Sequence, residues 1–254
     1  MLPIRLSHKW AKPLSDISSM GFRESDQALT RKAKRYNRRV PGTFLPHRPI
    51  LEKLIAALVL AAGVSSRMGR PKQTLLLNGV PMLQRVLEIF RGSKVRRTVV
   101  VLGANKAEVK RLVRFDGEIV IVNPRFAEGM SSSLRFGLKH VGRGVDAVII
   151  ALGDQPFVLP GTIDRLVEAY EHSRAHIVIP TYLGRRGNPV LFDKNVFSRI
   201  AKIRGDVGAK SVVLKNAADV LEVEVNDRGI LVDIDTPSDF RELQARRKRS
   251  RARV

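Results

Sequence analysis

From residue 54 onward, continuous apolar runs alternate with segments whose apolar residues recur at helical spacing. The runs are rich in Val, Ile and Leu, which is typical of strands buried on both faces of a mostly parallel sheet. Strands are predicted at Ile55–Leu60, Thr98–Leu102, Glu118–Val122, Ala147–Leu152 and Ile177–Pro180.

Helices are predicted between these strands, and the first has Leu83, Val86, Leu87 and Phe90 on one stripe. The expected helices are Pro81–Phe90, Lys106–Arg114, Ser131–Lys139 and Thr162–His172. The later part of the chain predicts a strand at Pro189–Phe192, helices near Asp193–Ile203 and Gly208–Lys215, strands near Val220–Val225 and Ile230–Ile234, and a last helix from Pro237. This alternation predicts an α/β fold of three layers, a doubly wound and mostly parallel sheet. Ligands of such sheets bind beyond the carboxyl ends of the strands, so the loops that follow strands are the informative ones.

Composition narrows the classes of function. The 254-residue chain has no cysteine, which excludes disulfides, thiolate zinc sites, iron–sulfur ligation and a cysteine nucleophile. Its five histidines occur in no metal-ligand spacing. The longest uncharged apolar run, Leu54–Val64, is too short to span a bilayer, so no membrane attachment is expected.

The net charge of +22 at first suggests a polyanionic partner, but it is unevenly distributed. Residues 1–50 carry 11 basic and 3 acidic side chains, and residues 241–254 carry 7 and 1. We therefore expect a basic N-terminal extension at 1–50 with little core, in which Ser25–Arg39 could form a short helix, a folded α/β domain at 51–240 and a basic tail at 241–254. Nucleic acid would bind these ends only non-specifically, because no base-reading motif is present. A cytoplasmic protein is expected, with organellar targeting by the basic start as the lesser alternative.

The loop after the first strand carries the most specific chemistry. Small residues there let backbone N–H groups approach a ligand, two hydroxyls add donors, and two cations can meet phosphate oxygens. The loop fits neither the P-loop nor the dinucleotide fingerprint, and an ordinary turn with solvated basic residues is the alternative. The candidate nucleotide-binding residues are Ala61, Ala62, Gly63, Ser65, Ser66, Arg67 and Lys72.

Other loops after strands carry further candidates. Asn123 leads into Gly129-Met130-Ser131-Ser132-Ser133, where hydroxyls and free N–H groups at a helix start suit an anion, although simple N-capping is the alternative. Asp154 follows the fourth strand with Gly153 before it, a position suited to Mg²⁺ beside a triphosphate, unless it merely caps a helix.

Near the end of the domain, Asp233 and Asp235 are two residues apart in a segment that is expected to be extended. Alternate residues of a strand point to opposite faces, so only one of the two can face the site. Asp235 is preferred, with Asp233 as its substitute.

In order, the strings LAAGVSSRMG, GMSSSL, LGDQP, RGNPVLF, GDVGAK and DIDTPSDF resemble the molybdenum cofactor cytidylyltransferase branch of the molybdopterin nucleotidyltransferase family, over about Leu58 to Asp239. The resemblance implies a Rossmann-like nucleotidyltransferase fold and a Mg²⁺-dependent transfer of CMP from CTP to the phosphate of molybdopterin, with release of pyrophosphate. Ala62 in LAAG favours CTP, because the GTP-using branch usually has LAGG. A recipient molybdoenzyme is the implied protein partner.

The resemblance also implies roles for individual residues. Lys72, Arg67 and Asp154 would be catalytic, and Asp154 with Asp235 would hold the metal. The implied acceptor-binding residues are Asn123, Gly129, Met130, Ser131, Ser132, Ser133, Gln155, Pro156, Gly187, Asn188, Pro189 and Asp206.

Three departures from the family pattern concern the acceptor more than the reaction. Asn188 replaces a common His, Lys210 replaces an Arg, and Phe126 replaces a frequent Trp. The alternatives are a GTP-using guanylyltransferase, a nucleotidylyltransferase with another phosphorylated acceptor such as a sugar phosphate, a non-catalytic adaptor, and a nucleic-acid-binding protein acting through its basic ends.

Overall fold

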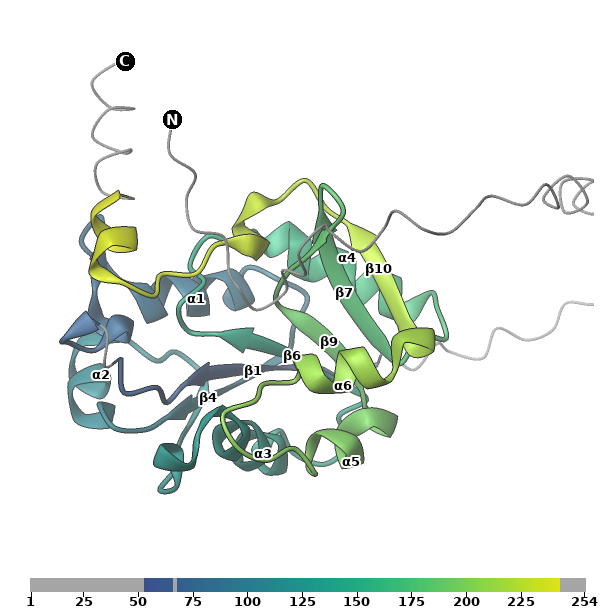
Figure 1. Ribbon diagram of the computed structural model, residues 1–254, viewed down its shortest axis with the longest axis horizontal. Coiled ribbons are helices and arrows are strands. Elements are labelled where there is room, and N and C mark those ends of the chain that lie inside the picture. The colour runs from purple at the N-terminus through teal and green to yellow at the C-terminus, as the bar shows by residue number, and fades with distance from the viewer. Residues whose placement is uncertain (1–52, 66–67, 243–254) are drawn as a thin grey trace, which may run out of the picture. The chain divides into compact units, whose positions relative to one another are not determined.

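A computed structural model describes residues 53–65 and 68–242. At its centre is an eight-stranded sheet of order β10-β7-β9-β6-β1-β4-β5, with β8 paired to β7 (Figure 1). The strands are β1 (Ile55–Ala61), β4 (Arg97–Leu102), β5 (Ile119–Val122), β6 (Ala147–Leu152), β7 (Ile177–Tyr182), β8 (Arg185–Arg186), β9 (Val190–Asp193) and β10 (Val220–Glu224). A separate hairpin joins β2 (Leu76–Leu77) to β3 (Val80–Pro81).

The sheet is mostly parallel. Strand β1 pairs in parallel with both β4 and β6, β5 continues beyond β4, and β10 is parallel to β7. Strand β9 runs antiparallel between β6 and β7, and β8 is antiparallel to β7. The chain moves outward from β1 to β4 and β5 and then returns to place β6 on the other side of β1. This reversal of strand order creates a crevice beyond the carboxyl ends of β1 and β6.

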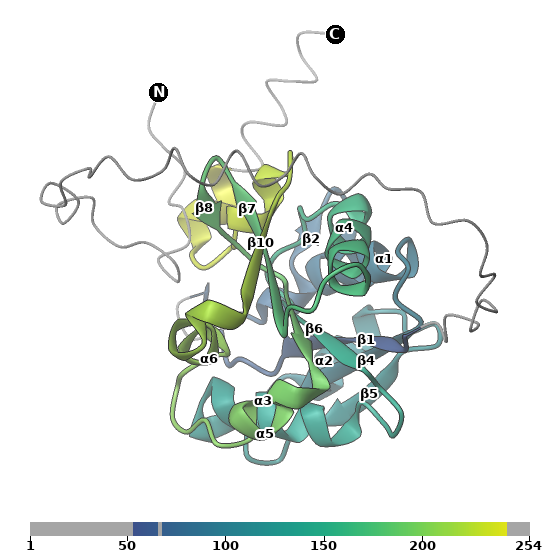
Figure 2. The same cartoon turned by 90° about the vertical axis from the view of Figure 1, so that its right-hand side faces the viewer.

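Helices cover both faces of the sheet, as Figures 1 and 2 show. One core joins α1 and α4 to one face, through residues such as Leu87 and Leu166, and includes Val109 of α2. The other core joins α3, α5 and α6 to the opposite face, through Leu134, Ile200 and Val213. The helices are α1 (Met82–Arg91), α2 (Lys106–Leu112), α3 (Met130–His140), α4 (Pro160–Glu171), α5 (Phe197–Ile200) and α6 (Lys210–Lys215). The predicted three-layer α/β fold is confirmed.

Helix ends follow from local chemistry. Pro160 stands at the start of α4, where its missing N–H costs nothing because that group would have no partner within the helix. Helix α1 ends at Arg91 and is capped by Gly92, whose N–H donates to the carbonyl of Glu88. Helix α3 begins after Gly129, whose φ of +93° is rarely adopted by residues that carry a side chain.

Two predicted elements differ from the structure. Residues Ile230–Ile234 form no strand: a 3₁₀ turn, Arg228–Leu231, is followed by extended chain without ladder pairing. Asp227 accepts a hydrogen bond from the N–H of Gly229 and starts this turn, so the apolar residues are buried without joining the sheet. The helix expected near Asp193–Ile203 is shorter, a 3₁₀ turn at Lys194–Val196 followed by α5.

Two hairpins were not predicted. The turn between β2 and β3 is Asn78-Gly79, with φ values of 56° and 77°, and this dipeptide is a strong hairpin signal. The turn between β7 and β8 is Leu183-Gly184, with φ values of 50° and 70°. A leucine at positive φ is rare, which explains why the second turn left no clear signal in the sequence.

The division into extension, domain and tail stays a prediction, because residues 1–50, with Ser25–Arg39, and residues 243–254 lie outside the described part of the chain. Residues 237–242 are helical, in agreement with the helix expected from Pro237. Among the described residues, no helix combines the length and the apolarity needed to cross a membrane.

Candidate functional site

A cavity of about 960 Å³ opens at the crevice between the carboxyl ends of β1 and β6. Its walls come from the loop after β1, the start of α3, the segment after β6, and the loop that leads into α6. The predicted site residues that line it are Ala61, Ala62, Gly63, Ser65, Lys72, Gly129, Met130, Ser133, Asp154, Asn188, Asp206 and Asp235.

The 3₁₀ turn Lys72–Thr74 is hydrogen-bonded to the loop after β1. Gln73 donates hydrogen bonds from Nε2 to the carbonyl oxygens of Ala61 at 2.9 Å and Gly63 at 3.4 Å. The hydroxyl of Ser65, a residue at φ 59°, accepts a hydrogen bond from the N–H of Lys72 at 3.0 Å. Ser66 and Arg67 lie outside the described residues, so their predicted roles stay predictions.

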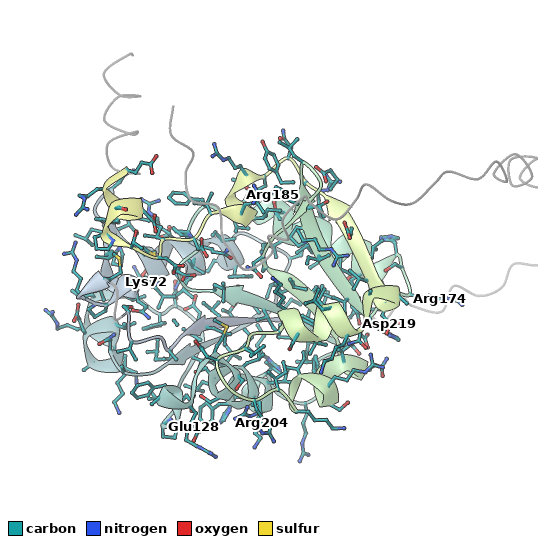
Figure 3. All side chains as sticks on the ribbon, viewed as in Figure 1. Lys72, Glu128, Arg174, Arg185, Arg204 and Asp219 are labelled. Atoms are coloured by element: carbon teal, nitrogen blue, oxygen red, sulfur yellow. The ribbon has the colours of Figure 1, made fainter. Side chains whose placement is uncertain are left out.

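Lys72 bridges two carboxylates that come from distant parts of the chain. Its Nζ lies 3.0 Å from Oδ2 of Asp154 and 2.7 Å from Oδ1 of Asp235. All three side chains are largely shielded from solvent, at 16%, 17% and 28% exposed. Figure 3 shows Lys72 within the outline of the protein, whereas Arg185 and Arg204 lie at its margin.

The ammonium group of Lys72 stays charged in this setting. Burial by itself would lower its pKa, but the negative charges of Asp154 and Asp235 and the hydrogen bonds to them outweigh burial, so the pKa is raised. A cation is therefore held between two carboxylates in the wall of the cavity.

The second carboxylate oxygen of Asp154 distinguishes this residue. Oδ1 is buried and has no hydrogen-bond partner among the described residues. The carbonyl oxygen of the same residue accepts a hydrogen bond from the N–H of Ile234 at 3.1 Å, which holds the segment with Asp235 beside the end of β6. Of the two aspartates near the end of the domain, Asp235 lines the cavity. Asp233 is 6% exposed and does not line it.

The start of α3 divides the three predicted serines. Ser133 lines the cavity, while Ser131 and Ser132 do not. Ser132 donates from Oγ to the carbonyl of Arg125 at 2.6 Å, and Ser131 accepts from the guanidinium of Arg135. Asn123 is buried behind them and donates from Nδ2 to the hydroxyls of Ser132 and Ser133 at 2.9 and 3.0 Å.

Asp206 joins the opposite wall to α3. Its Oδ1 accepts a hydrogen bond from the N–H of Met130 at 3.0 Å, so it caps the helix while it lines the cavity. The approach is close: a Cβ on Gly129 would lie 2.9 Å from the Cα of Asp206. Only glycine fits this contact without a shift of the backbone.

Besides Asn123, Ser131 and Ser132, four further predicted acceptor residues do not line the cavity: Gln155, Pro156, Gly187 and Pro189. Gln155 and Pro189 line a separate apolar recess of about 10 Å³. Gly187 packs against the backbone of Ile230, whose carbonyl oxygen would lie 2.5 Å from a Cβ at that position.

Several residues that line the cavity were not among the predicted site residues. Gln73, Phe126 and Lys210 are all in its wall. Lys210 ends the string GDVGAK, whereas Phe126 lies three residues before GMSSSL. Burial lowers the pKa of Lys210. The signal for Gln73 was its place directly after Lys72 at the start of an apolar run, where a buried polar side chain needs a specific partner.

The donor set fits a divalent cation shared with substrate. No group of three or more His, Cys, Asp or Glu side chains placed to hold a metal ion occurs in the described ranges. Asp154 and Asp235 supply a carboxylate pair, and one oxygen of Asp154 has no hydrogen-bond partner in the part of the chain that the structure describes. Mg²⁺ is commonly bound by one or two carboxylates together with waters and substrate phosphates, so the pair is sufficient.

Comparison with known proteins identifies the family. The sequence matches the MobA-like NTP transferase domain over residues 57–220, well over half of the chain. The chain belongs to this family. It is therefore a nucleotidyltransferase of the MobA-like type.

Curated relatives of similar length carry different names. The chain is 27% identical over 189 residues to nicotine blue oxidoreductase of Paenarthrobacter nicotinovorans, which covers 72% of this chain and 92% of the relative. It is 26% identical over 199 residues to molybdenum cofactor cytidylyltransferase of Escherichia coli, covering 73% and 93%. A longer relative is the bifunctional protein GlmU of Desulfitobacterium hafniense, to which the chain is 31% identical. That match covers 58% of this chain and 33% of GlmU.

Solved structures agree with the family. The protein Rv0371c of Mycobacterium tuberculosis is 30% identical, with a TM-score of 0.69, and the match covers 76% of this chain and 99% of that one. The same protein has also been solved in complex with manganese, with a TM-score of 0.66 to this chain. A divalent metal ion is therefore bound by a structural neighbour.

Proposed function

We propose that the protein transfers CMP from CTP to the phosphate of molybdopterin and releases pyrophosphate. The observation that carries this proposal is the convergence of Lys72, Asp154 and Asp235 beside the loop Ala61–Gly63 in one cavity. This places a fixed cation and a carboxylate pair next to a loop of small residues, which is what a triphosphate with a divalent cation requires.

The loop after β1 would receive the nucleotide. Ala61 and Ala62 have no side chain beyond Cβ, so base and ribose can lie against their backbone. Lys72 would neutralise charge on the triphosphate, together with Arg67 as predicted from the sequence. Because nucleotidyl transfer is an in-line displacement at the α-phosphorus, positioning and charge neutralisation are the main requirements, and no enzyme nucleophile is needed.

Asp154 and Asp235 would hold Mg²⁺. When bound, the ion supplies neutralisation of the charge shared by the triphosphate and the acceptor phosphate. Lys72 lies between the same two carboxylates, 3.0 Å from Asp154 and 2.7 Å from Asp235, and so holds them side by side. Oδ1 of Asp154 is the oxygen at which a bond to the metal would gain most, because it has no hydrogen bond from the described residues to lose.

The acceptor would enter from the side of α3. Gly129, Met130 and Ser133 form that wall, with Asn188 and Asp206 opposite. The acceptor phosphate is already ionised and serves as the nucleophile: its oxygen forms the new bond to the α-phosphorus as the bond to pyrophosphate breaks.

Pyrophosphate release from the four nucleoside triphosphates, with molybdopterin and other phosphorylated acceptors, tests this proposal. We expect activity with CTP, Mg²⁺ and molybdopterin, and its loss in Asp154→Ala with the fold unchanged by circular dichroism. Full activity of Asp154→Ala would contradict the metal assignment. In the same assay Ala62→Gly should reduce the preference for CTP over GTP, and an unchanged ratio would place base selection elsewhere.

A second candidate is transfer to another phosphorylated acceptor. It is favoured because two departures from the molybdopterin pattern, Phe126 and Asn188, both line the cavity. Relatives with equal similarity also bear names that point to different substrates. Pyrophosphate release with CTP and another phosphorylated acceptor, but none with molybdopterin, would select this candidate.

A further inference from the structure

We infer that Gln73 is a positioning residue for the nucleotide: its amide fixes the backbone of Ala61–Gly63 in the conformation that receives the base and ribose. The inference rests on the proposed nucleotide site and names a determinant that the family strings do not contain. Gln73 is 5% exposed and lies in the wall of the cavity.

The orientation of the Gln73 amide follows from its partners. Both groups within reach of Nε2, the carbonyls of Ala61 and Gly63, are acceptors, so the nitrogen must face them. The oxygen Oε1 consequently points elsewhere, and it is buried without a partner among the described residues. A buried acceptor that lacks a donor reduces stability, so this amide is not an arrangement that maximises stability.

The hydrogen bonds of Gln73 determine which way the neighbouring N–H groups of the loop point. In a trans peptide the C=O and the following N–H point in opposite directions. With the carbonyls of Ala61 and Gly63 turned toward Gln73, the N–H groups of Ala62 and Val64 are turned away from it. Gly63 and Val64 are exposed, so this side of the loop is open to a ligand.

The same short turn also places Lys72. The N–H of Lys72 donates to the hydroxyl of Ser65, while its ammonium reaches Asp154 and Asp235. One 3₁₀ turn therefore sets both the backbone that would hold the base and the cation that would meet the phosphates. Loss of the Gln73 amide should loosen the backbone of Ala61–Gly63 and leave the ammonium of Lys72 in place.

Gln73→Met tests the inference, because methionine keeps the length of the side chain and loses both donors. Calorimetric binding of CTP, GTP, ATP and UTP with Mg²⁺ is measured without acceptor, together with thermal unfolding. We expect Gln73→Met to weaken binding of the nucleotide that the wild type prefers by about tenfold, as for one to two net hydrogen bonds. Its unfolding temperature should change little, since the orphaned Oε1 is removed as well.

Thr74→Val is the matched control from the same turn. Thr74 is 9% exposed, and its hydroxyl donates to Pro71 and Glu108 and makes no hydrogen bond with Ala61–Gly63 among those described. Thr74→Val should lower the unfolding temperature, since it removes hydrogen bonding by a buried hydroxyl. Nucleotide affinity should stay within about twofold of wild type, because the contacts of Gln73 are kept. Should Gln73→Met fail to fold, Gln73→Glu replaces it: a buried carboxyl beside two carbonyls can donate only when protonated, so its deficit in affinity relative to wild type should shrink as the pH falls.

The outcomes separate the two proposals. Wild-type binding of any nucleotide with unchanged affinity in Gln73→Met overturns the role of Gln73 and leaves the proposed function standing. Binding of a nucleotide other than CTP that Gln73→Met weakens supports the role of Gln73 and contradicts the choice of CTP. A wild type that binds none of the four overturns both.

Discussion

The ammonium of Lys72 lies 2.7 Å from a carboxylate oxygen of Asp235, although 163 residues separate them in the chain. Lys72 follows the first strand, while Asp235 comes from the segment after the last 3₁₀ turn. The contact exists because that segment returns to the end of β6, where the N–H of Ile234 binds the carbonyl of Asp154. The site is therefore assembled from three loops that only the finished fold brings together.

Replacement of Lys72 should separate metal binding from turnover. Lys72→Met removes the cation between two carboxylates, so we expect pyrophosphate release to fall by about 10²-fold or more, the usual cost of losing a fixed charge at a reacting phosphate. Mn²⁺ affinity, measured by electron paramagnetic resonance, should be equal or higher, because no ammonium competes for Asp154 and Asp235. Lys72→Arg, which keeps the charge, is the control. Lower Mn²⁺ affinity in Lys72→Met would show that Lys72 supports the metal instead of competing with it.

Gly129→Ala should disturb the contact between α3 and the loop at Asp206. The residue adopts a φ of +93°, and its Cβ would lie 2.9 Å from the Cα of Asp206. The strained backbone and the displaced loop together should lower the free energy of unfolding by about 2 kcal/mol. Acceptor KM should rise more than nucleotide KM.

Gly161→Ala is the control for that substitution, since no atom of the described residues lies within 4 Å of its Cβ position and the glycine lies in α4. It should be neutral or slightly stabilising. Equal destabilisation of the two variants in urea would mean that the Gly129–Asp206 approach has no special cost.

Much of the fold could be predicted from the sequence, because strands buried on both faces leave continuous apolar runs. Strand β1 begins at the predicted residue and β6 has the predicted bounds. The failure at Ile230–Ile234 has a physical cause: Ile230 and Ile234 are fully buried, but in a 3₁₀ turn and a loop. An apolar run reports burial and does not report hydrogen-bond partners.

The candidate site was predictable only in part. Ends of parallel strands meet at one edge, which brings the segments around Lys72 and Asp154 together. Which of three consecutive serines would face the cavity was not predictable, because successive helical residues point about 100° apart and the orientation of α3 is set by tertiary packing. The role of Gln73 depends on two carbonyl groups, and backbone acceptors leave no mark in a sequence.

Asp227 should matter for stability and not for the site. It is 5% exposed and accepts hydrogen bonds from the N–H of Leu159, the hydroxyl of Thr162 and the N–H of Gly229. Asp227→Ala leaves buried donors unsatisfied, so the free energy of unfolding should fall by about 3 kcal/mol. Asp164→Ala, which loses one exposed hydrogen bond to the N–H of Lys94, should cost well under half as much. Nucleotide affinity of the folded Asp227→Ala protein should equal that of wild type, and a large loss would place Asp227 in the site.

Tyr170 predicts how stability changes at alkaline pH. Its hydroxyl donates to Oδ2 of Asp193 at 2.6 Å and to the carbonyl of Asp146 at 3.2 Å. Burial, together with the hydrogen bond to Asp193 and the charge of that residue, raises the pKa of the phenol above its usual value. Because only the neutral phenol donates, its stabilisation is complete below the unfolded pKa of about 10 and is lost as the pH rises above that value.

The measurement is the difference in free energy of unfolding between wild type and Tyr170→Phe, from urea titrations at several pH values. The difference should be constant between about pH 7 and 9, where both folded and unfolded tyrosine are protonated. Above about pH 10 it should shrink by up to about 1.4 kcal/mol per pH unit, since the unfolded chain then releases a proton that the folded chain retains. Phenylalanine cannot titrate, so changes common to both proteins, such as lysine deprotonation, cancel. A difference that stays constant through pH 11 would show that Tyr170 titrates alike in the folded and unfolded chains, and its contact with Asp193 would then contribute nothing.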